Sequence, residues 1–329
     1  MQKINTRRKL PSLFRWVLWV LLIQFLLINI SAAFYANRLT RFYDNKGLGE
    51  PTRSKNIFTK TWQLFAGPKY PKSIIRDQPV YPFETVTFNT AKGIKIEAWY
   101  ARLDSAAKGT VLLFHGLSVN KSRVLEEASA FRSLGYNIML VDFRAHGNSG
   151  GNTSTLGIRE TEEVKLAWDW VSQKGEKKIF LWGSSMGAVV VAKAISDYSL
   201  QPAAAILEMP FASMQSHFRG RARSLGFEGF PEKPFGFLVT CWAGIERGVK
   251  GFRHTTTRYV KNIHCPVLLQ WGSLDQSVSR EETNKIFEAI DSKDKKLVLY
   301  ERSAHQSMLE NEPGKWRTEV SQFLDRVDH

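Results

Sequence analysis

Cysteine is scarce in this chain of 329 residues, which contains only Cys241 and Cys265 and no C-x-x-C pair. Two cysteines cannot build a disulfide framework, and the missing C-x-x-C spacing excludes the usual zinc and thiol-redox motifs. Acidic residues are also under-represented, with 31 Asp and Glu against 46 Lys and Arg, which gives a formal net charge of +15. What remains, including 43% hydrophobic residues, 10 Trp and 21 Phe, is the composition of a folded chain with a substantial core.

The excess of basic charge lies in two segments. Residues 1–60 hold 11 basic and 2 acidic side chains, and residues 211–262 hold 9 and 3. A nucleic-acid-binding protein would carry its basic residues on a recognisable motif, and the sequence has no zinc finger, homeodomain-like arm or aromatic RNA-binding signature. We therefore expect no nucleic-acid partner.

Residues 16–36 form an apolar run of 21 residues without a charge. As a helix this run would be about 31 Å long, enough to cross a bilayer. A basic tail at residues 1–15 precedes it, and Trp16, Trp19 and Tyr35 lie near its ends, where interfacial aromatic residues prefer to lie. We predict a single-pass transmembrane signal-anchor helix in contact with membrane lipid.

The segment after this run, residues 37–77, is predicted to be a basic, irregular connector that lies against lipid headgroups. A cleavable signal peptide is the alternative to an anchor, because Ser31-Ala32-Ala33 has the small-x-small form of a cleavage site. Basic residues flank both ends of the run, so the positive-inside rule discriminates little between the two orientations. We place the rest of the chain on the non-cytoplasmic side of the membrane.

Residues 78–329 are predicted to form one α/β domain with a mostly parallel eight-stranded sheet and helices on both faces. Two β-rich runs flank the turn signal Lys92-Gly93 and predict an antiparallel hairpin at one edge. With that hairpin the expected strands are 83–90, 94–102, 110–114, 137–142, 178–182, 203–207, 266–271 and 296–300. Helical spacing of apolar residues predicts helices near 121–134, 158–173, 186–197, 279–290 and 313–327.

The strand at 178–182 runs into Gly183-Ser184-Ser185-Met186-Gly187 and then an apolar helix. A strand, a tight turn with small neighbours and a helix together present the central serine as a nucleophile, which makes Ser185 the candidate. A second G-x-S-x-G match, at Ser149, leads into a polar loop without a helix, and we interpret Ser149 as a loop residue.

A serine nucleophile needs a base, normally a histidine held by a carboxylate. Of the seven histidines, His305 follows the last strand, at the carboxyl edge of the sheet where ligands bind. Asp275 lies just past the strand at 266–271, so Ser185, Asp275 and His305 stand in the order that this architecture uses. Two alternatives remain: Asp275 as a helix N-cap, and Asp142 as the acid.

The tetrahedral intermediate of acyl transfer needs two N–H donors for its oxyanion. The residue after the nucleophile, Met186, would supply one, and Leu117, in the loop after the strand at 110–114, would supply the other. Gly116 would let the backbone approach the bound substrate closely.

These motifs resemble the α/β-hydrolase superfamily and, within it, the serine aminopeptidase and monoacylglycerol-lipase-like group. The residues that carry the resemblance occur in family order over about residues 83–327: His115-Gly116, Asp142-Phe-Arg144-Ala-His146-Gly147, Gly183-x-Ser185-x-Gly187, Gly272-x-x-Asp275 and His305. Ala145 stands where relatives often have glycine. The resemblance implies hydrolysis of an ester, amide or thioester through an acyl-enzyme, with neither cofactor nor metal.

In such relatives a cap occupies the position of residues 211–263, which here are rich in aromatic and basic residues. We expect this insert to cover Ser185, with Phe211 and Phe218 forming an acyl-binding wall and its arginines, Arg221 among them, facing anionic groups. An ordinary helical insertion with a solvated basic face is the alternative. The whole sequence thus predicts a membrane-anchored serine hydrolase of a small acyl ester; the alternatives are a peptidase, a thioesterase or a non-catalytic hydrolase-like binding protein.

Overall fold

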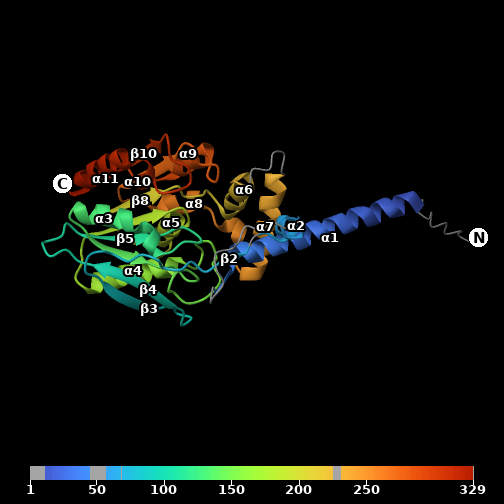
Figure 1. Cartoon of the computed structure of the whole chain (residues 1–329). Coiled ribbons are helices and arrows are strands. Elements are labelled where there is room, and N and C mark those ends of the chain that lie inside the picture. The colour runs from blue at the N-terminus through green and yellow to red at the C-terminus, as the bar shows by residue number, and fades with distance from the viewer. Residues whose placement is uncertain (1–11, 45–56, 68, 225–230, 329) are drawn as a thin grey trace, which may run out of the picture.

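The central sheet has eight strands in the order β10-β9-β8-β7-β5-β6-β4-β3 (Figure 1). The computed structural model describes residues 12–44, 57–67, 69–224 and 231–328. Their bounds are β3 Glu84–Asn89, β4 Lys95–Ala101, β5 Thr110–Phe114, β6 Asn137–Val141, β7 Ile179–Ser184, β8 Ala204–Glu208, β9 Val267–Gly272 and β10 Lys295–Tyr300. β3 and β4 form an antiparallel hairpin, β4 pairs antiparallel with β6, and the remaining pairs are parallel. The predicted mostly parallel eight-stranded sheet is confirmed.

Helices cover both faces of this sheet because successive residues of a strand point to opposite sides. Leu112 and Phe114 of β5 belong to the buried cluster formed with α4 (Thr161–Gln173), α5 (Met186–Tyr198) and α9 (Arg280–Ala289). Val111 and Leu113 belong to the opposite cluster, with α3 (Leu125–Ser133), α10 (Met308–Asn311) and α11 (Pro313–Asp328). The sheet is therefore the middle layer of three.

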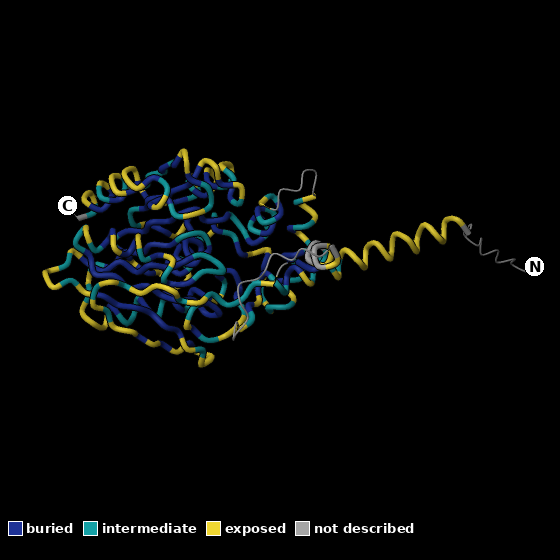
Figure 2. Tube along the Cα trace, in the orientation of Figure 1, coloured by how far each residue is buried: buried dark blue, intermediate teal, exposed yellow. Residues whose placement is uncertain are grey.

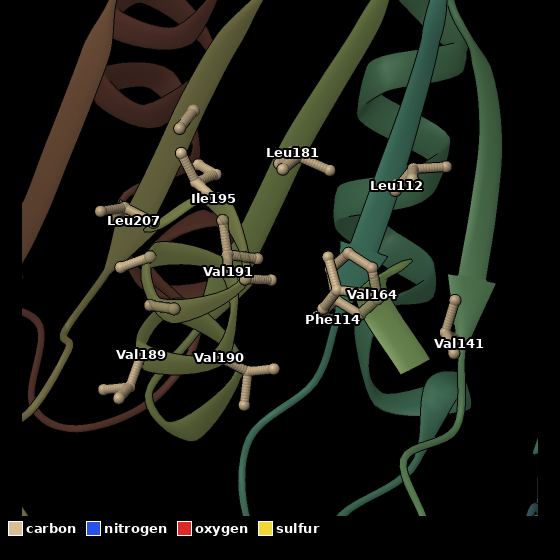
Figure 3. Packing of buried hydrophobic residues seen from close by; sticks show 14 of the residues in the cluster. Leu112, Phe114, Val141, Val164, Leu181, Val189, Val190, Val191, Ile195 and Leu207 are labelled. Atoms are coloured by element: carbon tan, nitrogen blue, oxygen red, sulfur yellow. The ribbon is translucent and has the colours of Figure 1, made fainter. Parts of the chain in front are cut away.

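Helix α5 is the most deeply placed helix of this domain. Its side chains are buried from Met186 to Ala192, and Val189, Val190 and Val191 belong to the same buried cluster as the sheet residues Leu181 and Leu207 (Figure 3). Tight packing around the strand β7 and the helix α5 fixes the turn between them.

The insert predicted at 211–263 is helical and lies between β8 and β9. It contains α6 (Met214–Ser224), α7 (Glu232–Arg247), the 3₁₀ turn η2 (Gly251–Arg253), α8 (Thr256–Tyr259) and η3 (Val260–Asn262). Residues 225–230 lie outside the described residues. We call residues 211–263 the cap.

Helix α1 (Ser12–Thr40) projects away from the domain, and most of its length is exposed (Figures 1 and 2). Among the described residues, Leu13–Thr40 is the one stretch of helix long and apolar enough to cross a membrane. The predicted span at 16–36 lies within it, but the helix continues to Thr40. Residues 1–11 of the predicted basic tail lie outside the described part of the chain.

The connector predicted to be irregular, residues 37–77, contains regular elements in addition to the end of α1. These are β1 (Phe42–Tyr43), α2 (Ile57–Ala66) and β2 (Tyr70–Pro71), and β1 pairs parallel with β2. Residues 45–56 and 68 lie outside the described residues. The expectation of an irregular segment is corrected here: α2 packs on α1, a tertiary contact that the local pattern of basic residues and prolines does not signal.

Candidate active site

The turn between β7 and α5 holds Ser185 in a conformation that is rare for a residue with a side chain. Its φ is 53° and its ψ is −114°. A Cβ added to Gly183 would lie 2.5 Å from the carbonyl carbon of Gly187, and one added to Gly187 would lie 2.1 Å from the carbonyl oxygen of Phe114. Only glycine fits at both positions, so the two glycines let the strained serine stand at the helix N-terminus.

His305 lies between Ser185 and Asp275, which are 120 and 30 positions away from it in the sequence. Its Nε2 is 2.8 Å from the Ser185 hydroxyl oxygen, and its Nδ1 is 2.7 Å from Oδ2 of Asp275. The carboxylate can only accept, so the Nδ1–H donates to Asp275 and the free Nε2 accepts from the Ser185 hydroxyl. The structure brings the three predicted residues into one hydrogen-bonded chain, at the carboxyl ends of β7, β9 and β10.

Asp275 is held in place by its second carboxylate oxygen. Its Oδ1 accepts hydrogen bonds from the backbone N–H groups of Ser277 at 2.7 Å and Val278 at 2.9 Å. The alternative role as N-cap of α9 belongs to Ser279, whose hydroxyl accepts from the Glu282 N–H at 3.3 Å. The Asp275 carboxylate is therefore oriented toward His305 by its own loop.

The two competing candidates from the sequence are used elsewhere. The Ser149 hydroxyl donates to the carbonyl of Asp142 at 2.7 Å and accepts from the N–H of Glu97 at 2.9 Å. The Asp142 carboxylate binds the Lys121 ammonium at 2.5 Å and the N–H groups of Lys121 and Asn148. Both side chains are fully buried and order the loops around them.

The residues predicted to donate to the oxyanion are close neighbours of Ser185 in sequence or in space. Met186 is the first residue of α5, and Leu117 follows Gly116, where an added Cβ would lie 3.5 Å from the Ser185 Cβ. Within the described residues, neither the Leu117 nor the Met186 N–H donates to another protein group. Two free donors beside the serine hydroxyl are what an oxyanion hole requires.

The loop that carries Leu117 is fixed by His146. Ser118 has a φ of 66° and donates its N–H to the His146 Nε2 at 3.1 Å. Burial lowers the pKa of His146 to about 3, so its ring is neutral, and its Nδ1–H donates to the Arg144 carbonyl at 2.8 Å. The neutral ring thereby orients the turn that presents the Leu117 amide.

A pocket of about 360 Å³ opens at Ser185 and His305. Phe211, predicted to form part of an acyl-binding wall, lines this pocket, and so does Arg221, one of the arginines of the cap. Phe218, also predicted as a wall residue, does not: it is fully buried in the cluster that joins α6 to α1 and α7. That expectation is wrong because the side of α6 that carries Phe218 packs on its neighbouring helices.

Two further residues that line the pocket are His217 and Glu127. Burial lowers the pKa of His217 to about 3 and raises that of Glu127 to about 7, so both are held toward their neutral forms. The helical spacing of Glu127 from Val124 and Phe131 places an acid on a buried helix face, a signal that sequence analysis could have used. His217 has no comparable sequence signal.

The residues of this site fall within a match to a known protein family. A family model described as serine aminopeptidase, S33 (Hydrolase_4), matches residues 105–228 and 244–312, more than half of the chain. The chain belongs to this family. The match spans the β5 loop, the Ser185 turn, part of the cap, Asp275 and His305.

Relatives of this family member include lipases and esterases. The lysophosphatidylserine lipase ABHD12 of Danio rerio is 25% identical over 196 residues, which cover 58% of this chain and 49% of the relative. The uncharacterized protein YqkD of Bacillus subtilis is 24% identical over 67% of this chain and 72% of its own. The chain thus spans about half the length of the curated lipases that it matches.

Solved structures show the same fold. The Pyrococcus furiosus esterase Pf2001 superimposes with a TM-score of 0.64 at 24% identity, covering 79% of this chain and 99% of the esterase. A bacterial membrane phospholipase A superimposes with a TM-score of 0.54 at 17% identity, covering 74% of this chain and 86% of that one. The α/β-hydrolase fold expected from the motifs is confirmed.

Proposed function

We propose that this protein is a membrane-anchored serine hydrolase that cleaves an acyl ester through Ser185, His305 and Asp275. The observation that carries the proposal is the hydrogen-bonded chain from the Ser185 hydroxyl through His305 to Asp275. A serine, an imidazole and an oriented carboxylate in this arrangement are the parts needed to make a nucleophile at neutral pH.

In the proposed mechanism the Ser185 oxygen attacks the ester carbonyl carbon, and its proton passes to the His305 Nε2. The carbonyl oxygen becomes an oxyanion and receives hydrogen bonds from the Leu117 and Met186 amides. The tetrahedral intermediate collapses, the carbon–oxygen bond to the alcohol breaks, and His305 returns the proton to the leaving alcohol. Water then attacks the acyl carbon and gives a proton to the His305 Nε2, which forms a second tetrahedral intermediate. This intermediate collapses, the bond between the acyl carbon and the Ser185 oxygen breaks, His305 returns the proton to that oxygen, and the free acid leaves.

The pocket supports a small substrate with one acyl chain. Apolar side chains of Leu117, Phe211 and Val278 line part of its wall, and Arg221 and Arg123 add positive charge. The lysophosphatidylserine lipases among the relatives act on a lipid that combines one acyl ester with an anionic headgroup. A monoacyl lipid ester, with an anionic head as the preferred form, is the proposed substrate class.

The membrane anchor is the exposed apolar part of α1, from Leu13 to Ile30. The last part of the same helix is buried in the protein: Ala32, Tyr35, Ala36 and Leu39 pack against the cap. This docking supports an anchor retained in the mature protein over a cleaved signal peptide, because cleavage after Ala33 would divide a packed helix. The orientation with the enzyme on the non-cytoplasmic side remains a prediction.

The proposal is tested with purified full-length protein and a panel of acyl esters of graded chain length, set against aminoacyl amides and acyl thioesters. We expect ester hydrolysis, and a loss of about 10⁴-fold or more in kcat for Ser185→Ala. Ser149→Ala, in the other G-x-S-x-G match, should keep activity in whatever fraction of the protein folds. Faster cleavage of amides or thioesters would replace the proposed reaction with a peptidase or thioesterase, and no turnover of any class would favour a binding protein.

A further inference from the structure

The solvent exposure of helix α1 differs sharply between its two ends. Large apolar side chains from Leu13 to Ile30 are exposed, and burial begins at Ala32 (Figure 2). The stretch of residues 13–30, which is exposed over nearly its whole length, is about 27 Å long as a helix, close to the thickness of a bilayer hydrocarbon core of about 30 Å. If α1 crosses the membrane, the polar surface of the bilayer therefore lies at about residues 29–32.

Two other helices lie against α1 just at this level. In α7, the Trp242 indole N–H donates to the Asn29 side chain at 3.3 Å, and Phe235 packs edge-on against Tyr35. In α2, the Trp62 ring lies 5.7 Å from the ring of Phe34. Figure 1 shows α7 running across α1, with α2 beside the same stretch of the helix. Both helices would thus lie in the headgroup layer.

Both helices carry large apolar side chains that are exposed. Phe58 is 80% and Trp62 47% exposed on α2, and Phe237 is 51% and Ile245 63% exposed on α7. Phe252 of η2 is also exposed, and its ring lies 5.1 Å from that of Phe237. Beyond α1, nine large hydrophobic side chains of the described residues are exposed, and these five lie on α2, on α7 or on η2, which packs on α7. An apolar patch of this kind marks a binding surface.

We infer that α2, α7 and the turn η2 insert into the headgroup layer of the leaflet that α1 enters, through Phe58, Trp62, Phe237, Ile245 and Phe252. We call these five residues the interfacial patch. The inference rests on the proposed anchoring by α1. Lipid is the occupant that the structure favours, because the patch adjoins an exposed helix segment that itself requires a hydrocarbon environment. Aromatic side chains are stabilised at this depth, where the apolar ring contacts lipid close to the polar headgroups.

This placement would bring the active-site pocket to the lipid surface. Helix α6 packs on α7, and Arg221 of α6 lines the pocket and donates to the Tyr70 hydroxyl. Tyr70 and Leu117, both pocket residues, also pack on the cluster that holds the end of α1. One wall of the pocket thus belongs to the same packed unit as the interfacial patch, so a monoacyl lipid would reach Ser185 from the leaflet surface.

The test uses full-length protein in liposomes, with a polarity-sensitive fluorophore on single cysteines in a Cys241→Ser, Cys265→Ser background. Phe58→Cys and Phe237→Cys report on the patch, and Leu21→Cys reports on the anchor. Val80→Cys is the matched control, because Val80 is also apolar and is 99% exposed. Val80 lies away from α1: the ring of its neighbour Tyr81 packs under Arg132 of α3, a helix far from α1 in Figure 1. Lipids with a nitroxide near the headgroup quench shallow labels, and lipids with a nitroxide near the chain end quench deep ones.

We expect the labels at 58 and 237 to shift to shorter wavelength and to be quenched by the shallow nitroxide, with the label at 80 unaffected. Labels at 58 and 237 that behave like the label at 80, while the label at 21 is quenched by the deep nitroxide, would overturn the patch and leave the anchor intact. A label at 21 that is not quenched would overturn both. Blue shifts that depend on protein concentration without lipid would assign the patch to a second copy of the chain.

A kinetic readout completes the test. The double variant Phe58→Glu, Phe237→Glu should lose at least about tenfold in the rate on an acyl ester embedded in vesicles, since two charges replace two rings that the inference places in lipid. Its rate on a soluble short-chain ester should stay unchanged, and Val80→Glu should change neither rate. Equal rates of the double variant and the wild type on the vesicle substrate would contradict the inference.

Discussion

The replacement Asp275→Asn tests how the loop around the acid controls the base. In the wild type, Oδ1 of Asp275 accepts the Ser277 and Val278 N–H groups, and Oδ2 accepts from the His305 Nδ1–H at 2.7 Å. Only the amide oxygen of asparagine can accept from the two backbone donors, so the amide NH₂ must face His305. His305 then accepts at Nδ1 and carries its proton on Nε2, where it can no longer receive the Ser185 proton.

The expected loss is about 10⁴-fold in kcat, or about 5.5 kcal/mol of barrier, with little change in thermal stability because both backbone donors keep a partner. The assay is steady-state hydrolysis of a soluble short-chain ester, with thermal unfolding of the same samples. Asp291→Asn is the matched control, since its exposed carboxylate lies in the same domain and should tolerate the change. A loss of less than tenfold for Asp275→Asn in a folded protein would refute the assigned tautomer and role.

Three further variants test packing and charge. Gly187→Ala would place its Cβ 2.1 Å from the Phe114 carbonyl oxygen, so we expect loss of folded protein in thermal unfolding, whereas Gly314→Ala, with open space around it, should be near neutral. Burial raises the pKa of Glu208 to about 8. The folded state therefore holds a proton that the unfolded state releases above a pH of about 4.5. The free energy of unfolding should accordingly fall from pH 5 to pH 8, by up to about 1.4 kcal/mol per pH unit. Glu208→Gln should flatten that dependence in urea unfolding, and equal slopes would exclude Glu208 as its source. Ala36→Leu should cost about 1–3 kcal/mol by overpacking the fully buried contact of α1 with the cap, and an unchanged melting temperature would show that α1 is not docked there.

The sheet, and the three residues Ser185, Asp275 and His305 that the structure brings together, could be predicted from the sequence because each depends on local signals. Buried parallel strands appear as short apolar runs, and each of the three residues follows the end of such a run. The turn at Ser185 is marked by Gly183 and Gly187, whose lack of a Cβ the structure requires. Chain order then narrows the choice of base and acid.

Features that depend on contacts between distant segments are less accessible from sequence. The aromatic side chain of Phe218 would suit an acyl pocket. Packing of α6 against α1 and α7 decides which side of α6 faces the pocket, and Phe218 lies on the packed side. The regular elements within 37–77 follow from the same docking. His217 gains its neutral, buried state from the folded surroundings of the pocket and carries no local pattern.

Covalent labelling with a fluorophosphonate, followed by peptide mass spectrometry, tests the proposed nucleophile most directly. An oxygen made nucleophilic by His305 attacks the phosphorus and keeps the adduct, so we predict one modified peptide, with the label on Ser185, and no label on the Ser185→Ala protein. Folded wild-type protein that stays unlabelled, or that carries the adduct on another serine such as Ser149, would contradict the assignment of Ser185 as the nucleophile.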